Sequence, residues 1–153
     1  MPLLSVPLLR QRDRTDCLPT CVEMVVAYFG QTVSPDWLRQ ALEATDIGTP
    51  GFKSLRLRHY GYDVTYIPAT DERPLVEALN AGIPPIALIL TRNLSYWRYH
   101  TAHAVVVIEL DPLTVTLNDP AFPDAPRQVP YDEFMLAWSD YDQLYAIVRP
   151  PIT

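Results

Sequence analysis

Cys17, His103 and Asp119 are the residues of this sequence whose types and order could carry out nucleophilic catalysis. Cys17 stands where a polar stretch gives way to an apolar one, a pattern that predicts a helix over residues 17–29 with Asp16 as its N-cap. Unpaired N–H groups and aligned peptide dipoles at a helix N-terminus favour a thiolate over a thiol. Because the thiolate is the form that attacks carbonyl carbon, Cys17 is the candidate nucleophile.

A cysteine nucleophile needs a histidine that exchanges protons with it, and the sequence contains three: His59, His100 and His103. Only His103 leads directly into a strand-like apolar run, residues 104–108, where a sheet would hold its ring in place. The alternative for His103 is a core histidine bonded to a backbone carbonyl. His100 is the alternative base, but its neighbours indicate a loop at the rim of a cleft. His59 falls on an expected helix and is assigned a structural role.

A second strand-like run, residues 113–118, ends at Asp119. A turn-forming Asp-Pro pair separates it from the run at 104–108, so the two strands are expected to be neighbours. That pairing would bring Asp119 beside His103 at one edge of the sheet. Because Asp119 precedes a proline, its alternative role is to cap a turn through its side chain.

Further residues complete a motif around these three. The residues that carry the pattern are Gln11, Asp16, Cys17, Cys21, His103, Asn118, Asp119 and Pro120. In order and spacing they resemble the C39 peptidases, the papain-like domains that cut leader peptides from bacteriocin precursors. The resemblance covers roughly residues 6–148, which is nearly the whole chain, and the local motif is fairly specific.

The resemblance implies a role for each of four residues. Cys17 would be the nucleophile, His103 the general base and acid, and Asp119 the residue that orients His103. Gln11 would supply a side-chain amide to the oxyanion hole, with the backbone N–H of Cys17 as the second donor. The resemblance also implies a papain-like fold, with the site in a cleft between a helical lobe and a sheet lobe.

The residues on either side of Cys17 are expected to influence which substrate is bound. The family usually has glycine directly after the nucleophile, and this chain has Leu18 there, which would reshape the substrate channel. We expect Leu18 and Asp16 to contact the substrate. The resemblance implies a peptide or precursor protein cut after a small-residue pair, commonly double glycine, and a separate transporter as a partner. Acyl transfer to an amine, or peptide binding without turnover, are the alternatives.

The composition favours a single domain over residues 1–153, because 48% of the residues are hydrophobic and can form one sizeable core. The net charge of −6 argues against a nucleic-acid partner, which would call for a basic face. Residues 1–10 lack the basic start and cleavage site of a signal peptide. No apolar run approaches the ~18 residues of a membrane span. We therefore expect a cytoplasmic protein.

Cys17 and Cys21 are expected to be free thiols. They lie one turn apart on the expected helix with both Cβ atoms on the same side, which is a poor geometry for a disulfide. A zinc site formed by these two cysteines with His103 and Asp119 is the metal alternative, but the chain has no second cysteine pair. We expect neither a metal nor another cofactor.

The hydrophobic periodicity predicts an α+β protein, with three helices followed by a mainly antiparallel sheet and helices inserted among its strands. The expected helices are residues 17–29, 34–42, 52–60, 71–80 and 132–138. The expected strands are residues 62–67, 85–90, 104–108, 113–118, 127–131 and 143–148.

Overall fold

A computed structural model describes residues 3–152; Met1, Pro2 and Thr153, which the expected domain includes, lie outside the described residues. The helices are α1 (Cys17–Tyr28), α2 (Pro35–Ala41), α3 (Arg73–Asn80) and α4 (Tyr131–Ser139), with the 3-10 helices η1 (Gly51–Tyr60) and η2 (Thr91–Asn93). The strands are β1 (Asp63–Pro68), β2 (Ile86–Leu90), β3 (Ala102–Leu110), β4 (Thr114–Asn118), β5 (Arg127–Pro130) and β6 (Leu144–Arg149).

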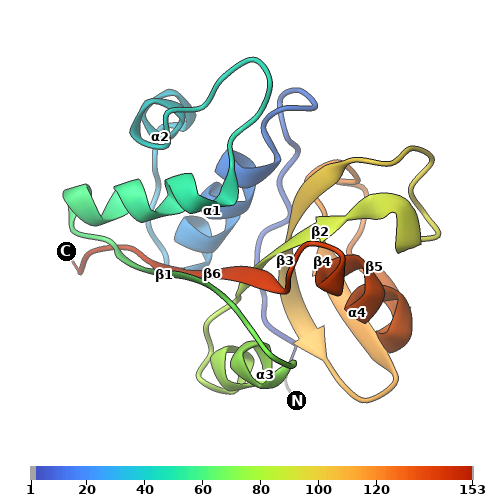
Figure 1. The fold of residues 1–153 in the computed structure, drawn as a ribbon. Coiled ribbons are helices and arrows are strands. Elements are labelled where there is room, and N and C mark those ends of the chain that lie inside the picture. Colours follow the sequence, from blue (N-terminus) through green and yellow to red (C-terminus); the bar gives the residue numbers. More distant parts are fainter. Residues whose placement is uncertain (1–2, 153) are drawn as a thin grey trace.

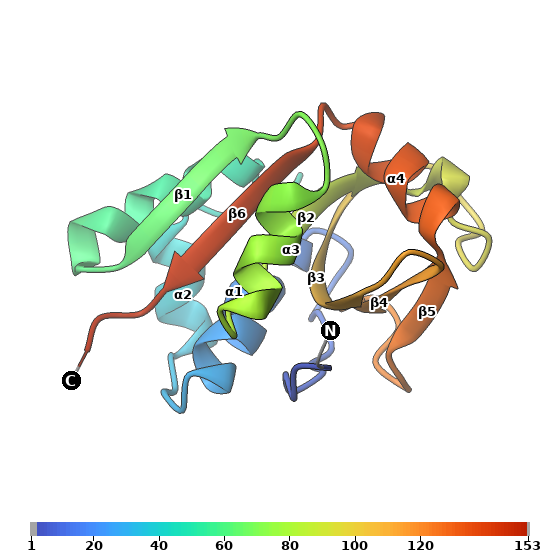
Figure 2. The same cartoon turned by 90° about the horizontal axis from the view of Figure 1, so that it is seen from below.

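The strands form one six-stranded sheet in the order β1-β6-β2-β3-β4-β5, and every pairing is antiparallel. Figure 1 shows α1 and α2 on one side of this sheet and α3 on the other. Figure 2, seen from below, places α3 in front of the sheet and α1 and α2 behind it. The protein therefore has the α+β architecture expected from the sequence.

Helix α1 is held against the sheet by its apolar residues and packs chiefly on β3. A fully buried aliphatic side chain stabilises the folded state by about 1.5 to 3 kcal/mol. Several such side chains on one face fix the helix, and with it Cys17 at the helix N-terminus. The fully buried apolar residues of α1 are Cys21, Val22, Met24 and Val25.

Local capping signals mark the start of α2 and the end of η1. The hydroxyl of Ser34 accepts a hydrogen bond of 3.3 Å from the N–H of Trp37, so Ser34 caps α2 as predicted. Gly61 ends η1 with φ at +85°, a left-handed conformation that glycine adopts without strain. The expected helix over residues 52–60 is present, but it forms as a 3-10 helix.

Asp16 is the N-cap residue of α1 as predicted, but its side chain does not form the capping hydrogen bond. It forms an ion pair with Arg39 of α2 instead. The Asp16 side chain is only 4% exposed, and a buried carboxylate is costly without an opposite charge, so pairing with Arg39 prevails over capping. The pair ties the start of α1 to α2.

The hairpin of β3 and β4 forms as predicted. Val106 pairs with Asn118 across the two strands, and a bulge follows at Val107 and Glu109. The carboxylate of Asp111 accepts the N–H groups of the turn that joins the strands. Over the described part of the chain, no helix has the length and apolar character needed to cross a bilayer.

Candidate active site

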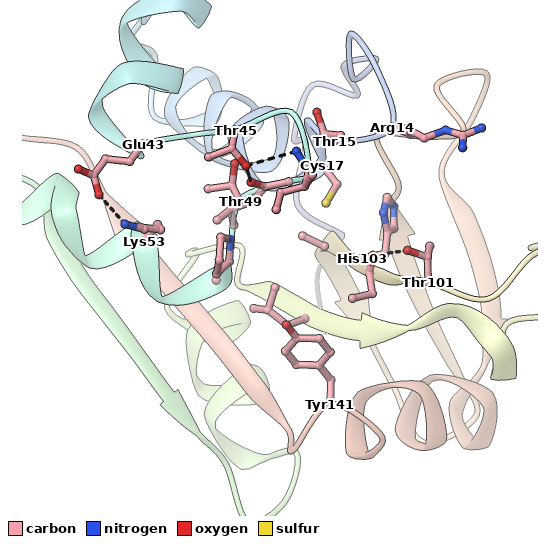
Figure 3. A pocket seen from close by; sticks show the side chains of 18 residues that line it. Arg14, Thr15, Cys17, Glu43, Thr45, Thr49, Lys53, Thr101, His103 and Tyr141 are labelled. Carbon is pink, nitrogen blue, oxygen red and sulfur yellow. Dashed lines mark hydrogen bonds and ion pairs between the residues drawn. The ribbon is translucent and has the colours of Figure 1, made fainter.

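Cys17 is the first residue of α1 and lines a cavity of about 700 Å³. The opposite wall comes from β2 and β3, and the loop between α2 and η1 closes one side. Figure 3 shows the sulfur of Cys17 and the ring of His103 projecting into this same pocket, with Tyr141 entering from another side. The nucleophile and the base predicted from the sequence are therefore brought together.

His103 lies on β3, opposite Ile89 of β2, and is only 4% exposed. Its Nε2 atom is 2.7 Å from Oδ1 of Asp119, which directly follows β4. Because Asp119 occupies Nε2, the Nδ1 atom is the ring nitrogen left for Cys17. The neighbouring strands β3 and β4 thus bring together the two residues that the sequence predicted to meet.

Asp119 is fully buried and accepts hydrogen bonds from four donors. Besides His103, the N–H of Ala121 lies 2.9 Å from Oδ1. The hydroxyl of Tyr96 lies 2.7 Å and the indole N–H of Trp97 lies 3.0 Å from Oδ2. Burial raises the pKa of Asp119, but the hydrogen bonds from His103, Tyr96 and Ala121 lower it below its usual value. Asp119 is therefore ionised.

Cys17 and His103 stabilise each other's charged forms. Burial raises the pKa of Cys17, but the hydrogen bond and charge of His103, with the N–H groups of Ala104 and Leu18, lower it below its usual value. Burial lowers the pKa of His103, but hydrogen bonds to Asp119 and Cys17 raise it to about 9. The site consequently favours a thiolate beside an imidazolium.

Cys21 lies one turn further along α1 and is fully buried. Burial, with the nearby charges of Cys17 and Asp119, raises its pKa well above the usual value, so Cys21 is a neutral thiol of the core. Both cysteines are free. Residues 3–152 contain no cluster of three or more His, Cys, Asp or Glu side chains that could hold a metal ion.

Gln11 lies beside the acid of the triad. Its backbone N–H donates a hydrogen bond of 2.9 Å to the carbonyl of Pro120, and the amide of Asn118 binds the carbonyl of Val6 at 2.9 Å. These two bonds hold the N-terminal segment against the end of β4. The side-chain oxygen of Gln11 is buried with no hydrogen-bond partner among residues 3–152, and Gln11 does not line the cavity. Its oxyanion role stays a prediction.

The two neighbours of Cys17 lie in different surroundings. Leu18 is buried and lines the cavity. Asp16 is engaged by Arg39 and is not among the lining residues. Of the two residues expected to contact substrate, the structure brings only Leu18 to the cavity wall.

The other histidines lie outside the site. His59 and His100 are exposed, and neither lines the cavity. Sequence reasoning missed Tyr96 and Trp97, which both bind the buried carboxylate of Asp119. The one signal for them was a group of aromatic residues in the short polar stretch just before His103.

Comparisons with known proteins identify the family and the fold. Residues 3–146 match the model of the Peptidase_C39 like family. The chain belongs to this family. The C39-like family model thus spans Gln11, Cys17, His103 and Asp119, the four residues singled out in the sequence. No curated protein matches this C39-like chain in sequence.

Solved C39 structures share the fold. A Bacillus anthracis protein, provisionally described as a C39-like peptidase, has a TM-score of 0.79 at 16% identity, covering 99% of this chain and 98% of its own. The peptidase domain of Streptococcus ComA, a bifunctional ABC transporter of a quorum-sensing pathway, has a TM-score of 0.75 at 19% identity, covering 95% and 98%. A double glycine motif protease from an AMS/PCAT transporter, in complex with the leader peptide, has a TM-score of 0.72 at 20% identity, covering 97% and 94%.

Proposed function

We propose that this C39-like protein is a cysteine peptidase that hydrolyses a peptide bond in a peptide or leader-bearing precursor. The observation that carries the proposal is the arrangement at the cavity wall. Cys17 faces His103, and the Nε2 atom of His103 lies 2.7 Å from the buried carboxylate of Asp119. This is the geometry that a thiolate nucleophile with an oriented base requires.

In the proposed acylation step, the Cys17 thiolate attacks the carbonyl carbon of the scissile amide. The negative charge that develops on the carbonyl oxygen is stabilised by the backbone N–H of Cys17, at the donor-rich start of α1, and by the side-chain amide of Gln11. The His103 imidazolium then donates its Nδ1 proton to the departing amine. The C–N bond breaks and a thioester to Cys17 remains.

In the proposed deacylation step, neutral His103 takes a proton from a water molecule, which attacks the thioester. The C–S bond breaks, the acid product leaves, and the Cys17 thiolate and the His103 imidazolium are restored. Asp119 keeps the proton on Nε2 throughout, so Nδ1 stays free to accept and donate on the Cys17 side. The carboxylate also stabilises the positive ring.

We further propose a substrate that is cut after two small residues, such as double glycine. Part of the wall beside the nucleophile is apolar: Leu18 follows Cys17, Ala104 donates its N–H toward the sulfur, and Leu88 pairs with Ala104 across the sheet. The names of two of the compared structures refer to transporters, and one also names a double glycine motif. These names support a leader-bearing substrate and a transporter as partner, here one encoded separately from this chain, and we propose a cytoplasmic site of action with them.

The test is cleavage of synthetic peptides that carry a double-glycine site, with the fragments identified by mass spectrometry. Cys17→Ala should abolish cleavage, whereas the matched control Cys21→Ala should retain it. In the unmodified protein, Cys17 should react with iodoacetamide near neutral pH much faster than Cys21. Equal, slow labelling without cleavage would contradict the proposal and favour a peptide-binding module without turnover.

A further inference from the structure

We propose that the loop of residues 94–101, between η2 and β3, is a clamp that holds the carboxylate of Asp119 in its working orientation. Tyr96 and Trp97 are the positioning residues of this clamp. The proposal rests on the proposed peptidase function, because it assigns the clamp to the acid that orients the base. Neither residue faces the cavity, and both act through Asp119.

The donors around Asp119 are divided between its two oxygens. Oδ1 binds Nε2 of His103 at 2.7 Å and the N–H of Ala121 at 2.9 Å. Among the described residues, Oδ2 binds only the clamp, through Tyr96 at 2.7 Å and Trp97 at 3.0 Å. Without the clamp, a fully buried charged oxygen would lose all its partners among residues 3–152, which strongly disfavours the observed orientation.

The indole of Trp97 also contacts the base directly. Its ring lies edge to face against the ring of His103, with centroids 4.6 Å apart and an interplanar angle of 65°. Trp97 therefore touches both partners of the hydrogen bond between His103 and Asp119. Its position keeps water away from that bond, which strengthens the electrostatic interaction within it.

Aromatic packing keeps the clamp in place. Phe122, in the turn after Asp119, packs edge to face on Tyr96 at 5.0 Å and on Trp97 at 5.2 Å between ring centroids. The guanidinium of Arg127 lies 5.4 Å from the ring of Tyr96 and 4.9 Å from that of Phe122. These contacts restrict the rotation of the Tyr96 side chain and so direct its hydroxyl at Asp119.

A buried threonine closes the base of the loop. The hydroxyl of Thr91 donates to the carbonyl of Tyr99 at 2.8 Å and accepts from the N–H of Thr101 at 2.9 Å. The Thr91 side chain is fully buried, and its backbone N–H donates to the carbonyl of Thr101 at 3.0 Å. Thr91 therefore fixes the C-terminal end of the clamp through these three bonds.

The experiment removes the clamp donors while keeping aromatic rings in their places. Tyr96→Phe and Trp97→Phe each leave one donor on Oδ2, so we expect each to lower kcat/KM by less than about tenfold. The double variant leaves none, and we expect a loss of about 100-fold with little change in KM. The matched control is Tyr99→Phe, in the same loop, whose hydroxyl makes no hydrogen bond to residues 3–152 and which should retain wild-type activity.

A second readout follows Cys17 without any peptide substrate. The rate of its alkylation by iodoacetamide, measured against pH, rises as the thiolate forms. In the double variant the carboxylate is no longer fixed in its orientation toward His103, so the imidazolium and the thiolate beside it are less stabilised and the rise moves to higher pH by about one unit. Thr91→Val should move the rise in the same direction, because it loosens the loop from a distance.

The outcomes separate the clamp from the peptidase reaction. If the folded double variant matches Tyr99→Phe in both kcat/KM and alkylation profile, the clamp is refuted. If the double variant fails to fold, the single variants Trp97→Phe and Thr91→Val provide the test. The clamp is then refuted if their alkylation profiles match that of the unmodified protein. If the variants shift the alkylation profile but the unmodified protein cleaves no peptide, the clamp stands and the proposed function fails.

Discussion

Replacing Asp119 with asparagine should lower both stability and activity more than the exchange of one carboxylate oxygen for an NH2 group suggests. Four donors converge on this fully buried carboxylate: His103 and Ala121 on Oδ1, and Tyr96 and Trp97 on Oδ2. Asparagine offers a single acceptor oxygen, so no orientation of its amide can satisfy all four. Papain-like proteases can use an asparagine at this point of the triad, but here the surroundings are arranged for a carboxylate.

The two orientations of the substituted asparagine fail for different reasons. With its oxygen on the Oδ1 side, the NH2 group faces the N–H of Trp97, donor against donor. With the oxygen on the Oδ2 side, the NH2 group faces Nε2 of His103, which must then accept and carry its proton on the Nδ1 side. Each lost hydrogen bond to a charged group costs about 1.5 to 3 kcal/mol, so we expect the free energy of unfolding to fall by about 2 to 4 kcal/mol.

The loss of activity should be larger than the loss of stability. The imidazolium of His103 loses its counter-charge, and part of the population holds the wrong tautomer. Comparable changes in hydrolytic triads lower the rate by about 10³- to 10⁴-fold, which corresponds to about 4 to 5.5 kcal/mol of transition-state stabilisation. The assay is kcat/KM on a cleaved peptide, alongside denaturant unfolding of the same preparations.

A second substitution makes the reasoning refutable. In the Asp119→Asn protein, Trp97→Phe removes the N–H that opposes the asparagine amide, so the double variant should regain about tenfold in kcat/KM and about 1 to 2 kcal/mol in stability. The same Trp97→Phe change should be harmful in the unmodified protein. If Asp119→Asn is nearly fully active, or if Trp97→Phe is harmful in both backgrounds, the four-donor account is wrong.

Three further outcomes are expected. Activity should rise with pH as Cys17 ionises below its usual pKa, and should fall again near pH 9 as His103 loses its proton, which a pH–rate profile would show. Arg39→Met leaves the carboxylate of Asp16 buried without its partner, so denaturant unfolding should report a loss of about 3 to 5 kcal/mol, and Arg39→Lys a smaller one. Gly51→Ala would place a Cβ atom 2.7 Å from a tyrosine ring of β1, so thermal unfolding should show a loss of about 1 to 3 kcal/mol.

The predictions that were confirmed depended on short-range signals. The apolar run after Cys17 formed α1, Ser34 capped α2, and the turn at Asp111 joined two strands that pair. Each of these features is determined by residues within a few positions of one another, through backbone geometry and hydrophobic periodicity. The helix expected over residues 52–60 also formed, although its 3-10 geometry was not foreseen.

The errors arose where a distant residue intervened. Asp16 has the side chain of a good N-cap, but Arg39 approaches it from another helix, and the attraction between the buried carboxylate and the partly buried guanidinium prevails over a capping bond. Tyr96 and Trp97 were given no role in the sequence analysis, because nothing in their local pattern shows that the loop folds back over Asp119. Neither contact leaves a periodic signal in the sequence.

The amino-acid sequence by itself determined which side chains could react, and in what order along the chain they occur, because the chemistry of Cys17, His103 and Asp119 belongs to the residues themselves. Only the tertiary structure decided their protonation states and orientation. Those depend on burial and on donors such as Tyr96 and Trp97, which reach Asp119 only when the sheet brings the end of β4 beneath the loop before β3.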